Sequence, residues 1–121
     1  MEKPVYITEK EREKCGKVAE AFAELYEMEN VLVMDAGRFG FVMLKYYRPP
    51  DGFEDMLTFT DRRSMFEELW EEWLCTKLFL LARGTPLERM GYSDIFHNLS
   101  EEEQDELMDR KNDFMKKAGL I

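Results

Sequence analysis

The sequence predicts an α+β domain, in which a three-stranded antiparallel sheet is combined with helices. Two observations lead to this prediction. Apolar residues recur at spacings of three and four over residues 61–82, which is typical of a helix packed on a core. Residues 30–60 contain three short apolar runs separated by turn signals, which is typical of a β-meander. We therefore expect an N-terminal helix, the meander, a long core helix packed on the sheet, a short helix and a C-terminal helix.

The first helix begins at a capping sequence. Thr8 stands three residues before Glu11, as in a capping box, and apolar residues then follow one helical stripe to about Met28. Just before it, Val5, Tyr6 and Ile7 fit either a short edge strand or a hydrophobic staple, and the sequence does not decide between them.

The three strands are predicted at residues 30–35, 39–47 and about 55–60. Gly37 lies in the first connection and supplies the positive φ that a short hairpin turn requires. Residues 48–52 form a second turn, because they contain two prolines, an aspartate and a glycine. Strands joined by such short connections pair in antiparallel fashion.

Both faces of this sheet are apolar. Two sets of side chains alternate along the second strand: Phe39, Phe41 and Met43 on one face, and Val42, Leu44 and Tyr46 on the other. Small antiparallel sheets commonly keep one face polar toward water. Either helices cover both faces or one face is reserved for a partner. Because four helical segments are available, we expect coverage of both faces from within the chain.

The core helix is predicted to begin after Asp61, an N-cap residue, and to end before Gly84. Its first half has a polar side that is rich in glutamate. From Leu74 onward the polar side nearly disappears, so we expect the helix to be solvated at its start and buried at its far end. The apolar run is too short to span a bilayer, which needs about 20 apolar residues.

Two more helices are predicted in the last third of the chain. Thr85 and Pro86 open a short one that stops near Gly91, and residues 92–97 are compatible with one further turn. Ser100 and Glu103 form a capping box for the last helix, which extends to about residue 118. Acidic residues crowd the first turns of that helix and lysines its last turn, as the helix dipole favours.

Length and charge limit the classes of function. The 121 residues form one domain, residues 1–121. A net charge of −9 argues against binding to nucleic acid through phosphate neutralisation. Two cysteines outside any CxxC pair, together with a polar N-terminus that lacks a signal sequence, predict a bacterial-type cytoplasmic setting. We expect neither a nucleic-acid nor a membrane partner.

Catalytic and metal-binding patterns are lacking in the sequence. His97 is the single histidine, and Cys15 and Cys75 both fall on segments predicted to be buried, so neither a zinc site nor a Cys–His pair is expected. The carboxylate pairs lie on solvated helix faces. We therefore predict no enzyme activity and no cofactor. Arg62 and Arg63 are placed where an anion could sit, at the start of the core helix.

The leading hypothesis is a non-catalytic module that binds another protein or itself, for example as a homodimer. An acidic inhibitor or immunity-type protein is one form of this hypothesis. Its candidate interaction residues are Phe39, Phe41, Met43, Tyr46, Tyr47 and Arg48, because aromatic residues and arginine are enriched at interfaces. The alternative is a small-ligand-binding or enzymatic domain with a pocket between the sheet and the core helix. Arg62, Tyr46 or His97 would be its polar contacts.

Overall fold

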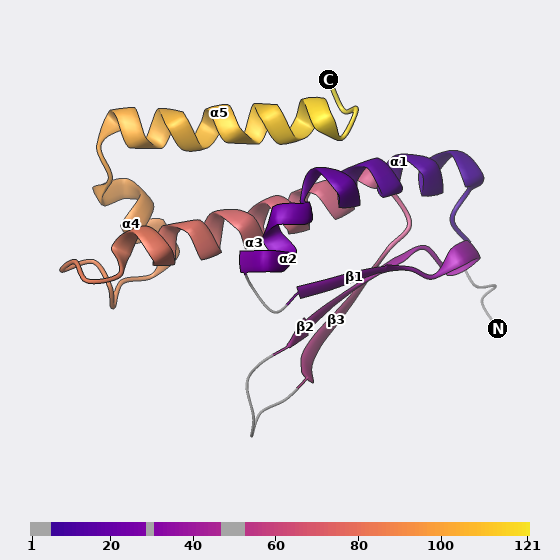
Figure 1. Ribbon diagram of the computed structural model, residues 1–121, viewed down its shortest axis with the longest axis horizontal. Coiled ribbons are helices and arrows are strands. Elements are labelled where there is room, and N and C mark those ends of the chain that lie inside the picture. Colours follow the sequence, from indigo (N-terminus) through magenta and orange to yellow (C-terminus); the bar gives the residue numbers. More distant parts are fainter. Residues whose placement is uncertain (1–5, 29–30, 47–52) are drawn as a thin grey trace.

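The computed structural model describes residues 6–28, 31–46 and 53–121, and it has the predicted α+β class. Its elements follow in this order: α1 (Glu9–Ala21), α2 (Ala23–Met28), β1 (Val31–Asp35), the 3₁₀ turn η1 (Gly37–Phe39), β2 (Phe41–Tyr46), β3 (Phe53–Phe59), α3 (Arg62–Ala82), α4 (Tyr92–Asn98) and α5 (Glu101–Lys117). The helices and strands lie in layers (Figure 1). The sheet forms one side, α1 and α3 lie side by side, and α5 packs on both of these helices on the side away from the sheet.

The sheet has the predicted meander order, with β2 between β1 and β3 and both pairs antiparallel. Phe41 lies opposite Phe59, and Met43 opposite Leu57, so these residues share one face. This inner face is packed into the core, where Phe41 is 5% and Met43 0% exposed. Helices therefore cover only one face, and the expectation that they cover both is wrong. The reason lies in the layering: α5 packs on α1 and α3 and not on the sheet.

The short connection between the antiparallel strands β1 and β2 contains the 3₁₀ turn η1. Gly37 has the predicted positive φ of 65°, and Gly40 has a φ of 95°. A Cβ atom on Gly40 would lie 2.1 Å from the carbonyl oxygen of Phe59, so the backbones meet there more closely than any side chain allows. As a result β2 begins at Phe41, and Phe39 lies outside the strand.

The predicted N-terminal helix is divided at Phe22. Thr8 caps α1 by accepting a hydrogen bond from the Glu11 N–H at 3.2 Å, as expected. The chain leaves the helical conformation at Phe22 (φ −100°, ψ 20°) and resumes it in α2. Phe22, at the break, and Leu25, in α2, are both fully buried. Burial of these two side chains thus overrides the helical continuity that the sequence predicts.

The burial of α3 is the reverse of the expectation at its far end. Its first three turns are buried through Met65, Phe66, Leu69, Trp70 and Trp73. In the last turns only Leu78 and Ala82 are buried, whereas Phe79, Leu80 and Leu81 are 48%, 45% and 41% exposed. This end of α3 extends past the sheet toward α4 (Figure 1), so too few elements surround it to cover every side.

Residues 85–90 do not form the predicted short helix. The Thr85 hydroxyl donates a hydrogen bond to the Ala82 carbonyl at 2.6 Å and accepts one from the Leu87 N–H at 3.2 Å, which holds this segment in turns. The short helix is α4 instead. The capping box of Ser100 and Glu103 is present at the start of α5, as predicted.

We predict that Asp61→Ala lowers the free energy of unfolding by about 1 kcal/mol at neutral pH. Asp61 caps α3 by accepting a hydrogen bond from the Ser64 N–H at 2.9 Å, and this bond lowers the pKa of the carboxyl group. Because the folded pKa lies below the unfolded value of about 3.9, the stabilisation is complete above that value and is lost as the pH falls through the folded pKa. Urea titrations at pH 7 and at about pH 2.5 measure both effects.

Asp61→Asn is the control for this prediction, because asparagine caps a helix without a titratable group. It should retain most of the stability at neutral pH while losing part of the acid dependence. An equal loss for Asp61→Ala at both pH values would show that the carboxylate cap does not stabilise α3.

Candidate functional site

The outer face of the sheet is an exposed apolar surface. The strand register places two rows of side chains on it: Leu32, Leu44 and Met56 in one row, and Met34, Val42 and Thr58 in the other. Leu32, Met34 and Met56 are 47%, 43% and 59% exposed, and Val42 and Leu44 are half-buried. We call these six residues the outer sheet face.

None of the six side chains of the outer sheet face is charged, although charged residues make up 36% of the chain. Monomeric proteins rarely expose contiguous apolar patches larger than a few hundred Å², and larger ones commonly mark binding sites. The surface arises directly from β-strand geometry, because successive side chains point to opposite faces. Phe41 and Met43 point into the core, and Val42 and Leu44 therefore point away from it.

The interaction residues predicted from the sequence are only partly on the surface. Phe41 and Met43 are buried on the inner face of the sheet, which lies toward α1 and α3 (Figure 1), so these two predicted residues are not on the exposed surface. Phe39 is 51% exposed, in η1. Tyr46 ends β2, but its side chain lies outside the described residues, as do Tyr47 and Arg48. The prediction for these three residues therefore stays untested, and the exposed apolar residues of the sheet that the structure describes are those of the outer sheet face.

Phe39 belongs to a small exposed cluster at one end of the sheet. The Arg38 guanidinium carbon lies 5.1 Å from the ring centre of Tyr6 and 5.2 Å from that of Phe39. Ile7 is buried, and its N–H donates to the Arg38 carbonyl at 2.9 Å, which fixes this segment against η1. Tyr6 and Ile7 form no strand, and Val5, the third residue of that prediction, lies outside the described residues.

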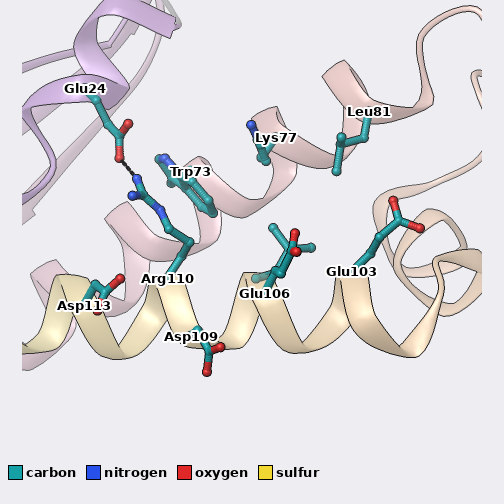
Figure 2. Close-up of a pocket in the computed structure, with 10 residues that line it drawn as sticks. Glu24, Trp73, Lys77, Leu81, Glu103, Glu106, Asp109, Arg110 and Asp113 are labelled. Carbon is teal, nitrogen blue, oxygen red and sulfur yellow. Dashed lines mark hydrogen bonds and ion pairs between the residues drawn. The ribbon is translucent and has the colours of Figure 1, made fainter.

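A cavity of about 650 Å³ lies between α3 and α5 (Figure 2). It is lined by Trp73, Lys77 and Leu81 from α3 and by Glu24 from α2. The α5 residues that line it are Glu103, Glu106, Leu107, Asp109, Arg110 and Asp113. The alternative hypothesis from the sequence requires a pocket between the sheet and the core helix. This cavity is on the other side of α3, and Arg62 and His97 are not among the described residues that line it. The side chain of Tyr46, the third predicted contact, lies outside the described residues.

Arg110 contacts three other side chains at the centre of this cavity. Its guanidinium forms an ion pair with Glu24, and its central carbon lies 5.4 Å from the ring centre of Trp73 and 5.0 Å from that of Phe114. Trp73 is 2% exposed, and its indole Nε1 has no hydrogen-bond partner among the described residues. A buried N–H without a partner costs about 1–3 kcal/mol. The cavity therefore contains an unsatisfied donor beside an ion pair.

The predicted anion contact at the start of α3 is occupied by the chain itself. The backbone N–H of Arg62 donates a hydrogen bond to Glu11 Oε2 at 3.1 Å. The guanidinium Nη1 of Arg62 lies 3.6 Å from Glu11 Oε1. The carboxylate of Glu11 thus takes the place that a free anion would occupy at this helix N-terminus. Arg63 is exposed.

The remaining reactive side chains lie on three different helices. Cys15 is fully buried, and burial raises the pKa of its thiol to about 11, which suppresses the thiolate. His97 is exposed on α4, and Cys75 is half-buried on α3. Within the described ranges, no group of three or more histidine, cysteine, aspartate or glutamate side chains could hold a metal ion. None of the helices in the same ranges is long and apolar enough to cross a membrane.

Comparison with protein-family models, with curated proteins and with solved structures finds no match to this chain.

Proposed function

We propose that this chain is a non-catalytic self-association module, and that two copies pair through their outer sheet faces. The observation on which this rests is the outer sheet face itself, a continuous pair of apolar rows without a charged group. In the proposed dimer the two sheets stack about 10 Å apart, with helices on both outer sides. A two-fold axis would place each apolar row against a row of the second copy.

A second copy fits this surface better than a dissimilar partner does. Selective recognition of a different protein generally uses charged or hydrogen-bonding groups that exclude wrong partners. Thr58 is the single hydrogen-bonding side chain among the six residues, and it lies at the end of one row. A second copy needs no such group, because an apolar face meets an identical apolar face and no charge is buried without a partner.

The area of the outer sheet face determines how tightly the two copies are expected to bind. Strand spacing and rise give the outer sheet face a footprint of roughly 14 Å by 14 Å. A standard stable interface buries about 800 Å² on each partner. The six residues alone supply much less, so we expect a reversible dimer with a Kd weaker than about 1 µM.

The net charge of the chain determines how dimerisation responds to added salt. Each copy has a charge of −9, so two copies repel each other at low ionic strength. Salt screens this repulsion, since the Debye length falls to about 10 Å at 0.1 M, and it leaves the apolar contact in place. Dimerisation should therefore strengthen as salt is added. An acidic inhibitor bound to a basic partner would show the opposite response, because screening weakens opposite-charge attraction.

Sedimentation equilibrium of the wild type, Leu44→Lys and Met56→Lys tests this proposal. Leu44→Lys places an ammonium group in the centre of the apolar contact, and Met56→Lys places one at the end of the same row; in either position the group would lose water without gaining a partner. Both substitutions also reduce the net negative charge, so a weaker dimer could not be explained by added repulsion. We expect the dissociation constant to rise at least tenfold in each variant.

Met108→Lys is the matched control, because Met108 is 39% exposed on α5 and the charge change is the same. It should dimerise like the wild type. Phe79→Lys tests the exposed end of α3 as a rival interface. A wild type that stays monomeric up to millimolar concentration in high salt would contradict the proposal, as would loss of the dimer in Phe79→Lys alone.

A further inference from the structure

We propose a second binding site, independent of the outer sheet face: the cavity between α3 and α5 binds a short extended peptide segment rich in lysine or arginine. Its lining contains five carboxylates and two cationic groups, so the cavity attracts positive charge. One of the two cations, Arg110, is already paired with Glu24. Figure 2 shows Glu106 and Asp113 along the side that α5 contributes, facing Lys77 and Trp73 of α3.

The unpaired indole of Trp73 indicates that the ligand also brings a hydrogen-bond acceptor. Trp73 Nε1 is a donor only, and nothing in the described residues accepts from it. A protonated polyamine would satisfy the carboxylates but has no acceptor to offer. An extended peptide has both groups, since its side chains carry the charge and its backbone carbonyls are free. A helical peptide uses most of its carbonyls internally, and it fits this requirement less well.

Arg110 is the cavity residue that lies over the indole ring of Trp73. The ion pair that holds Arg110 to Glu24 is solvent-exposed, with side chains 40% and 44% accessible. Exposed pairs of this kind contribute only about 0–1 kcal/mol. A basic side chain of the ligand could therefore take the place of Arg110 at Glu24, at the cost of this weak pair and of the contacts of Arg110 with the rings of Trp73 and Phe114.

The length of the cavity limits the length of the peptide segment that it can bind. Glu103 and Asp113 are ten residues apart in α5, which corresponds to about 15 Å along a helix. An extended chain rises about 3.3 Å per residue, so four or five residues span this distance.

NMR titration of the full chain with a capped pentapeptide of alternating lysine and leucine tests the proposal. The chain has two tryptophans, so two indole N–H signals are expected, and Trp73→Phe identifies the one from Trp73. We expect saturable binding in which the Trp73 signal moves downfield, as it does when a hydrogen bond forms, while the Trp70 signal moves much less. Trp73→Phe should weaken binding several-fold, since it removes the donor and keeps a ring.

Two double variants with the same change in net charge separate the site from general attraction. Glu106→Gln/Asp113→Asn alters the lining of the cavity, whereas Glu102→Gln/Asp105→Asn alters exposed carboxylates of α5 that do not line it. We expect the first to weaken binding at least fivefold and the second less than twofold. Equal weakening would overturn the proposal. So would a static Trp73 signal at saturating peptide, or equally tight binding of spermidine with the same shifts.

Discussion

Phe114→Ala should lower the free energy of unfolding by about 3–5 kcal/mol, the largest effect expected of a single truncation in this chain. Phe114 is 1% exposed and joins α5 to the rest of the core. Its ring is stacked on Phe22 with centres 4.4 Å apart and meets Trp73 edge-on at 5.2 Å. Removing the ring leaves a cavity bordered by three helices, and rigid aromatic neighbours cannot collapse to fill it.

Urea unfolding followed by tryptophan fluorescence measures this effect, because Trp70 and Trp73 border the same cluster. Met108→Ala is the control on the same helix. Its side chain is 39% exposed, so we expect a change within about 0.5 kcal/mol. If both substitutions cost the same, α5 is not held to the core through Phe114.

Gly40→Ala should destabilise the chain by about 3 kcal/mol or more. Two costs combine at this position. The φ of 95° is strained for any residue with a side chain, and the new Cβ would lie 2.1 Å from the Phe59 carbonyl oxygen. That oxygen belongs to the backbone of β3, so relief requires a shift of the strand and not a rotation of a side chain. The substitution therefore disturbs the register between β2 and β3.

Gly37→Ala is the matched control in the same turn. Its φ of 65° is also positive, but a Cβ there would meet nothing within 4 Å. We expect a cost of roughly 1–2 kcal/mol from the backbone conformation alone. The difference in urea midpoint between the two variants measures the contact with Phe59. Equal midpoints would mean that the turn relaxes without moving β3.

Local signals in the sequence were sufficient for the fold class. Capping by Thr8, Asp61 and Ser100 depends on residues three apart, and each cap is present at the predicted position. The antiparallel meander follows from short connections. The helix predicted at Thr85 is absent because the same local signals are ambiguous there. A capping residue followed by proline marks a turn as well as a helix, and six residues offer too little apolar surface to favour the helix.

The side of the sheet that packs inward could not be read from the strands alone. Alternation divides β2 into two sets, and both sets are apolar, so strand periodicity gives no preference. The choice depends on where α1 and α3 lie, because the face toward these helices (Figure 1) is the one on which Phe41 and Met43 are buried. The same limit applies to α3, whose apolar far end predicts burial although no element of the described chain covers Phe79, Leu80 and Leu81.

The cavity between α3 and α5 could not be predicted from the sequence. Its central ion pair joins Glu24 and Arg110, which are 86 residues apart. The charges on α5 are explained by helix capping and the helix dipole when taken alone. They define a site only after tertiary packing places them opposite Trp73 and Lys77.

The most direct test of the self-association proposal is an isotope-filtered NOE experiment on a mixture of labelled and unlabelled chains at high protein and salt concentration. The proposal predicts NOEs between protomers that connect the methyl groups of Leu32, Leu44 and Met56. Intermolecular NOEs confined to Phe79, Leu80 and Leu81 would move the interface to the end of α3. The absence of any intermolecular NOE at millimolar concentration would contradict self-association through the outer sheet face.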